Sequence, residues 1–273
     1  MKTLYVTDLD GTLLRHDESL SEFTITTINQ LIDRGMLFCY ATARSAYTAC
    51  KVTQGLSMHM PMIVYNGVFI KDGSTDTNLL SNCFDAGIKD VLHDLLNHDI
   101  YPIVYAMLED RERFSYVFEK CNQETKDFIY SRKEDKRNRS VNDIQNLYDG
   151  TIFYISCLGT EDLLAPFYEK YKNQYHCIFS KDTYTHAQWL ELLPLNVSKA
   201  SAVMQLKSLL ACDKVVAFGD GKNDIAMFEV ADESYAVANA VDELKDKATG
   251  IIESNEADGV AKWLLANYRI DDC

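Results

Sequence analysis

The chain has 273 residues, of which 47% are hydrophobic and 25% are charged, values that are typical of a globular protein. This length allows one large or two modest domains, each with its own core. The formal net charge of −14 argues against a nucleic-acid-binding surface, because phosphate backbones require a basic footprint. An anion site in so acidic a chain needs local positive charge from a metal ion or from a few placed Lys and Arg residues.

No stretch of the sequence predicts export or membrane insertion. The first residues run straight into a predicted strand without the features of a secretory signal. No segment approaches the roughly 18 consecutive apolar residues of a transmembrane helix. The eight cysteines contain no C-x-x-C pair, which favours reduced thiols over disulfides or a zinc site. We therefore expect a cytoplasmic protein without a membrane partner.

The first predicted strand ends in two acids. Residues 4–7 (Leu-Tyr-Val-Thr) read as a buried strand, and residues 8–12 (Asp-Leu-Asp-Gly-Thr) follow directly. Buried carboxylates repel each other, so a cation or a shared proton is expected beside them. If strand geometry continues, Asp8 and Asp10 face the same way and converge on one ion. The alternative is an ordinary Asp-Gly turn.

The next elements follow the order of a parallel α/β sheet. Residues 19–22 (Ser-Leu-Ser-Glu) form a capping-box pattern that begins at Ser19, and an apolar stripe from Phe23 to Ile32 predicts a helix. The apolar run 36–41 then ends at Thr42. Strand, helix and strand in this order predict a right-handed crossover. The polar residues that follow these two strands then lie at the carboxyl edge of the sheet, where ligands of such sheets bind.

The middle of the chain reads as an inserted domain. Asn66-Gly67 between apolar runs predicts a β-hairpin. From there we predict an α/β domain at 82–190 that interrupts a core domain formed by 1–81 and 191–273. The charged run 132–137 is expected to form a solvated face, with anion binding as the alternative.

A second strand with an acidic loop lies near the C-terminus. Residues 214–218 (Lys-Val-Val-Ala-Phe) precede 219–224 (Gly-Asp-Gly-Lys-Asn-Asp), and a predicted helix opens earlier at Ser198-Lys199. Two acidic loops in one parallel sheet can meet at a common edge. Carboxylate oxygens without nearby His or Cys suit a hard cation such as Mg²⁺.

These motifs resemble the haloacid dehalogenase superfamily of phosphatases, and within it the Cof-type subfamily with a large α/β cap. The resemblance covers nearly the whole chain and rests on residues 8–12, on Ala41-Thr42-Ala43-Arg44, on Ser198-Lys199 and on residues 219–224. It implies a doubly wound, Rossmann-like parallel-sheet core with an inserted α/β cap. It also implies an Mg²⁺-dependent phosphatase of small phosphate monoesters, foremost sugar phosphates or otherwise phosphorylated cofactors, that works through an aspartyl-phosphate.

The resemblance also implies a role for each motif residue. Asp8 is the nucleophile and a metal ligand, and Asp10 is the general acid and base whose backbone carbonyl helps to bind the metal. Asp220 is a further metal ligand, and Asp224 acts from outside the coordination sphere. Phosphate is held by Leu9, Thr42, Ala43, Lys199 and Asn223, of which Thr42 and Lys199 also count as catalytic.

Several alternatives stay open. Thr42 alone is more often a helix N-cap, and Arg44 either contacts phosphate or pairs with a carboxylate. The same intermediate serves a sugar phosphomutase or phosphotransferase, and a similar acidic pocket serves a non-catalytic phosphoacceptor or sensor. The expected partner is a small phosphorylated metabolite, and the expected state is a monomer or weak homodimer. Candidate cap contributors to specificity are Tyr105, Tyr184, His186 and Trp189.

The sequence also departs from the family pattern. Asn196 and Ala200 stand where many Cof-type members have Gly, and the segment 236–240 keeps Asn-Ala but lacks the usual preceding Met and Gly. None of these changes removes a catalytic group.

Overall fold

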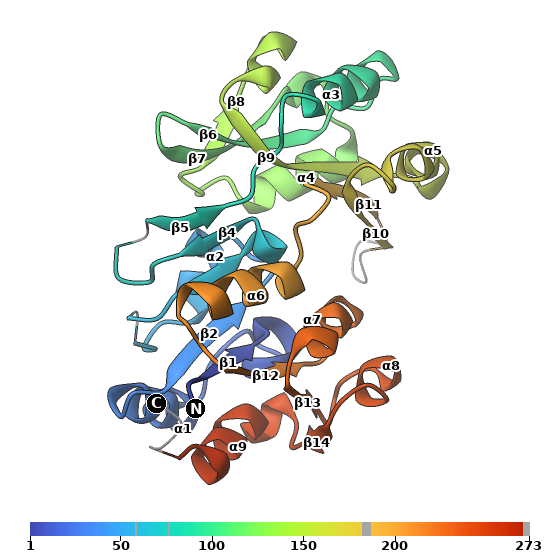
Figure 1. Cartoon of the computed structure of the whole chain (residues 1–273). Coiled ribbons are helices and arrows are strands. Elements are labelled where there is room, and N and C mark those ends of the chain that lie inside the picture. The colour runs from blue at the N-terminus through green and yellow to red at the C-terminus, as the bar shows by residue number, and fades with distance from the viewer. Residues whose placement is uncertain (58, 76, 182–186, 270–273) are drawn as a thin grey trace. The chain divides into compact units, whose positions relative to one another are not determined.

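The structure, a computed structural model, describes residues 1–57, 59–75, 77–181 and 187–269 (Figure 1). The chain forms two compact units, a core unit of Met1–Ser81 and Val197–Cys273 and an inserted unit of Asn82–Asn196. The inserted unit therefore extends beyond the predicted end at 190, because the strand Gln188–Leu193 pairs with two strands of that unit. Among the described residues, no helix is long and apolar enough to cross a membrane.

The core unit is built on an eight-stranded sheet with the order β14-β13-β12-β1-β2-β3-β4-β5. Neighbouring strands from β14 to β3 are parallel, and β4 and β5 extend the sheet in antiparallel fashion. The strands are β1 (Thr3–Thr7), β2 (Leu37–Ala41), β3 (Met62–Val64), β4 (Phe69–Lys71), β5 (Asn78–Ser81), β12 (Lys214–Gly219), β13 (Glu233–Val237) and β14 (Gly250–Ile252).

The helices of the core unit come from both ends of the chain. α1 packs beside α9, and α6 packs beside α7 (Figure 1). The helices are α1 (Glu22–Asp33), α2 (Ala46–Val52), α6 (Lys199–Leu209), α7 (Ile225–Val230), α8 (Asp242–Lys245) and α9 (Gly259–Asn267). This arrangement confirms the predicted doubly wound α/β core, in which β1 from the N-terminal part lies between β2 and β12.

The inserted unit has a six-stranded sheet with the order β10-β11-β9-β6-β7-β8. Its buried core includes the fully enclosed Leu92, Leu95 and Leu164, each of which contributes roughly 1.5–3 kcal/mol by burial. Its elements are α3 (Ile88–Asn97), β6 (Ile103–Leu108), β7 (Arg111–Tyr116), α4 (Gln123–Ser131), β8 (Asn138–Ser140), β9 (Thr151–Gly159), α5 (Glu161–Tyr171), β10 (His176–Lys181) and β11 (Gln188–Leu193).

The start of α1 differs from the prediction. The N-cap is Ser21, whose hydroxyl accepts a hydrogen bond from the Thr24 N–H at 2.9 Å, and the predicted cap at Ser19 is wrong. Phe23, which the apolar stripe included, is 41% exposed, whereas Ile28 is fully buried. The buried face of the helix is formed by Thr24, Thr27, Ile28 and Leu31, and Phe23 lies outside it.

The charged run 132–137 is not a fully solvated face. Arg137 and Asp135 are buried, and the Arg137 guanidinium lies 2.6 Å from the Asp135 carboxylate and 3.8 Å from that of Glu112. Buried charges persist only when they are paired. The sequence of this run does not predict the pairing of Arg137 with Glu112, because Glu112 lies in a strand more than twenty residues earlier.

The predicted hairpin at Asn66-Gly67 is confirmed, since β3 and β4 pair in antiparallel register around it. Gly67 has φ +103, and a Cβ there would lie 2.3 Å from the carbonyl oxygen of Ser198. Only glycine therefore lets the hairpin pack against the start of α6. This contact supports the end of the helix on which Lys199 lies.

Candidate active site

The two acidic loops meet because β1 and β12 are adjacent parallel strands. The Asp8 N–H donates to the carbonyl of Phe218 at 2.9 Å, which fixes the end of β1 against the end of β12. Carboxylate oxygens of Asp8, Asp220 and Asp224 all lie within 4.8 Å of one another. The sheet thus brings together three of the four acids that the sequence predicts at this edge.

Lys199 is the cation of this cluster. Its side chain is buried, and its Nζ lies 2.8 Å from Oδ1 of Asp8 and 2.8 Å from Oδ1 of Asp224. Ser198 caps α6 through a capping box with Ser201, so Lys199 begins the helix in a fixed position. Burial disfavours the charge on Lys199, but the carboxylates of Asp224 and Asp8 outweigh it and raise the pKa of the lysine.

One lysine does not balance three carboxylates. Burial raises the pKa of Asp8 to about 8, and the charge of Asp224 adds to this effect while Lys199 opposes it. Burial also raises the pKa of Asp220 to about 6, although the hydroxyl of Thr12 donates to its Oδ1 at 2.9 Å. Without a further cation, Asp8 and Asp220 hold protons more tightly than ordinary aspartates do.

Asp224 differs from the other two acids because both of its oxygens are engaged. Its Oδ1 accepts from Lys199, and its Oδ2 accepts the backbone N–H groups of Asp220 and Gly221 at 3.1 Å each. Its carboxylate packs closely on Gly219, where a Cβ would lie 2.8 Å from it. Asp224 therefore holds the loop that carries Asp220 in place.

The carboxylate of Asp10 does not converge with that of Asp8, so this geometric expectation is wrong. The backbone leaves strand geometry in the turn Leu9–Leu13, where Gly11 has φ +75. The Asp10 side chain is 49% exposed and accepts hydrogen bonds from Arg44, with Nε 2.8 Å from Oδ2 and an Nη atom 2.5 Å from Oδ1. The same Nη atom lies 3.1 Å from Glu18.

The structure therefore decides between the two expectations for Arg44, which pairs with carboxylates. Thr42 is fully buried directly after β2, and its hydroxyl accepts the Arg44 N–H at 3.1 Å. The helix α2 is instead capped by Ser45, so the N-cap alternative for Thr42 is wrong. Spacing alone does not reveal this, because both residues are good caps within one turn of the helix.

The remaining predicted phosphate-binding residues lie in the loops at this edge. Leu9 is fully buried, and because its side chain is apolar only its backbone N–H could bind phosphate, whereas Ala43 and Asn223 are exposed. Asn223 lies in the short turn Lys222–Asp224 that follows β12. The contacts of Thr12 with Asp220 and of Glu18 with Arg44 are not among the sequence predictions. Thr12 lies within the first motif, but no sequence signal indicates Glu18.

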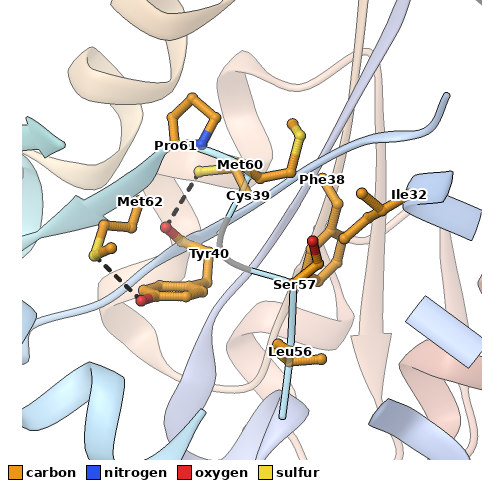
Figure 2. A pocket seen from close by; sticks show the side chains of 9 residues that line it. All are labelled: Ile32, Phe38, Cys39, Tyr40, Leu56, Ser57, Met60, Pro61 and Met62. Atoms are coloured by element: carbon orange, nitrogen blue, oxygen red, sulfur yellow. Dashed lines mark hydrogen bonds between the residues drawn. The ribbon is translucent and has the colours of Figure 1, made fainter. Parts of the chain in front are cut away.

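A separate cavity lies beside β2 (Figure 2). It has a volume of about 20 Å³, which is room for about one water molecule. The Tyr40 hydroxyl donates to the Met62 sulfur at 3.2 Å within it. Its lining consists of Ile32, Phe38, Cys39, Tyr40, Leu56, Ser57, Met60, Pro61 and Met62. None of the predicted site residues is among them, so this cavity is not the candidate active site.

Of the candidate cap contributors, Tyr184 and His186 lie outside the described residues. Tyr105 is buried in an aromatic cluster with Phe114 and Tyr154. Trp189 is partly buried, and its ring packs edge-on against Phe128.

A parallel sheet whose adjacent strand ends hold an acidic cluster and a buried lysine, together with an inserted α/β unit, is the architecture of haloacid dehalogenase-type hydrolases. The chain belongs to this family, since the model for haloacid dehalogenase-like hydrolases matches residues 5–264. The predicted family and enzyme class are thereby confirmed, and the protein is a phosphatase of the Cof type.

Individual relatives match along almost their whole length. The 5-amino-6-(5-phospho-D-ribitylamino)uracil phosphatase YitU of Bacillus subtilis is 26% identical, covering 98% of both chains. The phosphatase YwtE of the same organism, which bears the same substrate name, is 28% identical over 94% of this chain and 95% of its own. The crystal structure of TM0651 from Thermotoga maritima has a TM-score of 0.80 at 23% identity, covering 98% of each chain.

Proposed function

We propose that the protein is an Mg²⁺-dependent phosphatase that hydrolyses small phosphate monoesters through an aspartyl-phosphate on Asp8. The observation that carries this proposal is the buried contact of Asp8 with Lys199 at 2.8 Å, beside the carboxylate of Asp220. A carboxylate so placed has a fixed orientation and a neighbouring positive charge. Both are needed if it is to attack an anionic phosphate.

The donor set fits a hard divalent cation. The acidic group at the strand ends offers carboxylate oxygens, and because both oxygens of Asp224 are engaged, Asp8 and Asp220 would supply the side-chain ligands. The backbone carbonyl of Asp10 is the proposed third protein ligand. A bound Mg²⁺ supplies positive charge that lets a carboxylate approach phosphate and that stabilises charge on the transferring group.

The proposed reaction has two displacements. An oxygen of Asp8 forms a bond to phosphorus in line with the leaving oxygen, and the bond between phosphorus and that oxygen breaks while Asp10 donates a proton to it. Asp10 then takes a proton from water, whose oxygen attacks phosphorus and releases Asp8. Charge on the phosphoryl oxygens would be met by Lys199 and by the phosphate-binding set Leu9, Thr42, Ala43 and Asn223.

For the substrate, we propose phosphorylated sugars or sugar alcohols. Both named relatives are phosphatases of a compound that carries a phosphorylated ribityl chain, which is a reduced sugar. Identity near 27% over nearly full length supports a related substrate class rather than the same compound.

Phosphate release from a panel of sugar, sugar-alcohol, pyridoxal and flavin phosphates tests this function. We expect turnover of sugar or sugar-alcohol phosphates with Mg²⁺ and loss of turnover with a chelator. Transfer of phosphate to an added sugar instead of water would indicate the phosphotransferase alternative. A lack of turnover with every ester, despite stable phosphorylation, would indicate a sensor and overturn the proposal.

A further inference from the structure

The segment that follows β13 contacts both acidic loops. The side-chain amide of Asn239 donates to the carbonyl of Gly11 at 2.7 Å, in the turn that follows Asp8. Two residues later, the backbone N–H of Val241 donates to the carbonyl of Asp220 at 2.9 Å. One short segment therefore links the loop of Asp8 and Asp10 to the loop of Asp220.

The orientation of the Asn239 amide is set by a second asparagine. The Oδ1 of Asn239 accepts the backbone N–H of Asn255 at 3.0 Å, so the amide nitrogen of Asn239 is the atom that faces Gly11. Asn255 is buried, and its own amide nitrogen donates to the carbonyl of Leu14 at 2.9 Å. The two asparagines thus bind the carbonyl of Gly11, in the middle of the turn Leu9–Leu13, and the carbonyl of Leu14, directly after it.

Movement of this turn would be transmitted to the acids. A Cβ at Gly11 would lie 2.3 Å from Oδ2 of Asp220, so the turn and that carboxylate are in close contact. Thr12, the next residue, bonds the other oxygen of Asp220. Mg²⁺ requires oxygen ligands at roughly 2.0–2.1 Å in near-octahedral geometry, so a shift of a few tenths of an ångström between the loops would weaken binding.

We propose that Asn239, fixed by Asn255, is a positioning residue that sets the spacing of the two acidic loops for metal binding. This inference rests on the proposed function, because it concerns the cation site of the phosphatase. The inference gives a role to Asn239, which belongs to the Asn-Ala pair of the segment 236–240. The four motifs of the predicted site do not include this pair. Asn239 acts through Gly11 and Asp220 and is not itself a ligand.

The test compares Asn239→Leu with the matched control Asn267→Leu. Both changes remove a surface amide of similar size without altering charge, but the Asn267 amide donates to the Trp263 carbonyl on α9, outside the acidic loops. Titration calorimetry with Mg²⁺ alone measures metal affinity without turnover. We expect about tenfold weaker Mg²⁺ binding for Asn239→Leu, as for other residues that orient ligands, and no change for Asn267→Leu.

Kinetics and a second variant separate positioning from general loss of structure. With saturating Mg²⁺, we expect Asn239→Leu to recover most of the wild-type kcat, with an unchanged KM and a melting temperature in chelator close to wild type. Asn239→Ser, which adds no apolar surface, should show the same loss of affinity. Unchanged Mg²⁺ affinity in both Asn239 variants overturns the inference. Failure of the wild-type protein to bind Mg²⁺ at all would instead count against the proposed function.

Discussion

The ammonium group of Lys199 lies 2.8 Å from a carboxylate oxygen of Asp8, and both side chains are buried. The same ammonium lies 2.8 Å from Asp224, so one cation serves two acids that come from loops more than two hundred residues apart. This contact joins the two halves of the core unit at the point where phosphate chemistry is proposed.

Replacement of Lys199 by Met should destabilise the protein as well as abolish activity. The change leaves Asp8 and Asp224 buried without their cation, which typically costs about 3–5 kcal/mol. Lys207→Met is the control, because Lys207 lies on the same helix and pairs with the more exposed Asp232 at 3.1 Å. Urea denaturation should show a loss of about 0–1 kcal/mol for the control. Equal losses in the two variants would contradict the assigned role.

Replacement of Asp8 by Asn should remove turnover and leave the fold intact. Asparagine is similar in shape and can still accept from Lys199, but it cannot form the acyl-phosphate, so we expect a loss of at least about 10³-fold in kcat. Because burial disfavours the charge of Asp8, the melting temperature should not fall. Asp213→Asn, at an exposed position bonded to the Lys2 N–H, serves as the control with wild-type activity. Substantial turnover by Asp8→Asn would exclude it as nucleophile.

Stabilisation by Mg²⁺ should increase with pH. The pKa values of Asp8 (about 8) and Asp220 (about 6) exceed the ordinary value of 3.8, so the metal-free folded state binds protons more tightly than the unfolded state does. This contribution to stability is present below pH 3.8 and is lost as pH rises to 8. The cation binds the deprotonated acids. The increase in melting temperature on adding Mg²⁺ should therefore be larger at pH 8 than at pH 6; the reverse trend would contradict this linkage.

Replacement of Gly11 by Ala should weaken metal binding in addition to destabilising the fold through backbone strain. Ala at φ +75 costs roughly 1–2 kcal/mol, and its Cβ would lie 2.3 Å from Oδ2 of Asp220. Gly35→Ala provides a matched comparison, because Gly35 has φ +99 but follows α1, outside the acidic loops. Both variants should lose stability in chelator, and only Gly11→Ala should lose Mg²⁺ affinity by calorimetry. Normal Mg²⁺ affinity in Gly11→Ala would show that the turn Leu9–Leu13 does not determine the geometry of the metal site.

Local patterns predicted much of the core unit because strand, helix and loop signals there are short-range. The apolar runs before Asp8 and Asp220 do form adjacent parallel strands. The errors at the helix caps are local, between residues two or three positions apart. Other errors arise where a partner that is distant in sequence determines how a side chain lies. Asp10 turns away from Asp8 toward Arg44, which approaches from the end of another strand, and Arg137 is buried because Glu112 and Asp135 pair with it.

The positions of the asparagines illustrate the same limit. Asn239 follows β13, whereas its acceptor Gly11 lies near the N-terminus, and no spacing rule connects them. Their contact follows from the order of strands in the sheet. The contact can be recognised only in the three-dimensional structure.

The stereochemical course at phosphorus tests the central claim most directly. Hydrolysis of a substrate with an isotopically chiral phosphate reports whether one or two in-line displacements occur. Attack by Asp8 followed by attack of water on the aspartyl-phosphate predicts net retention of configuration. Net inversion would show direct attack by water and would contradict the role of Asp8 as nucleophile.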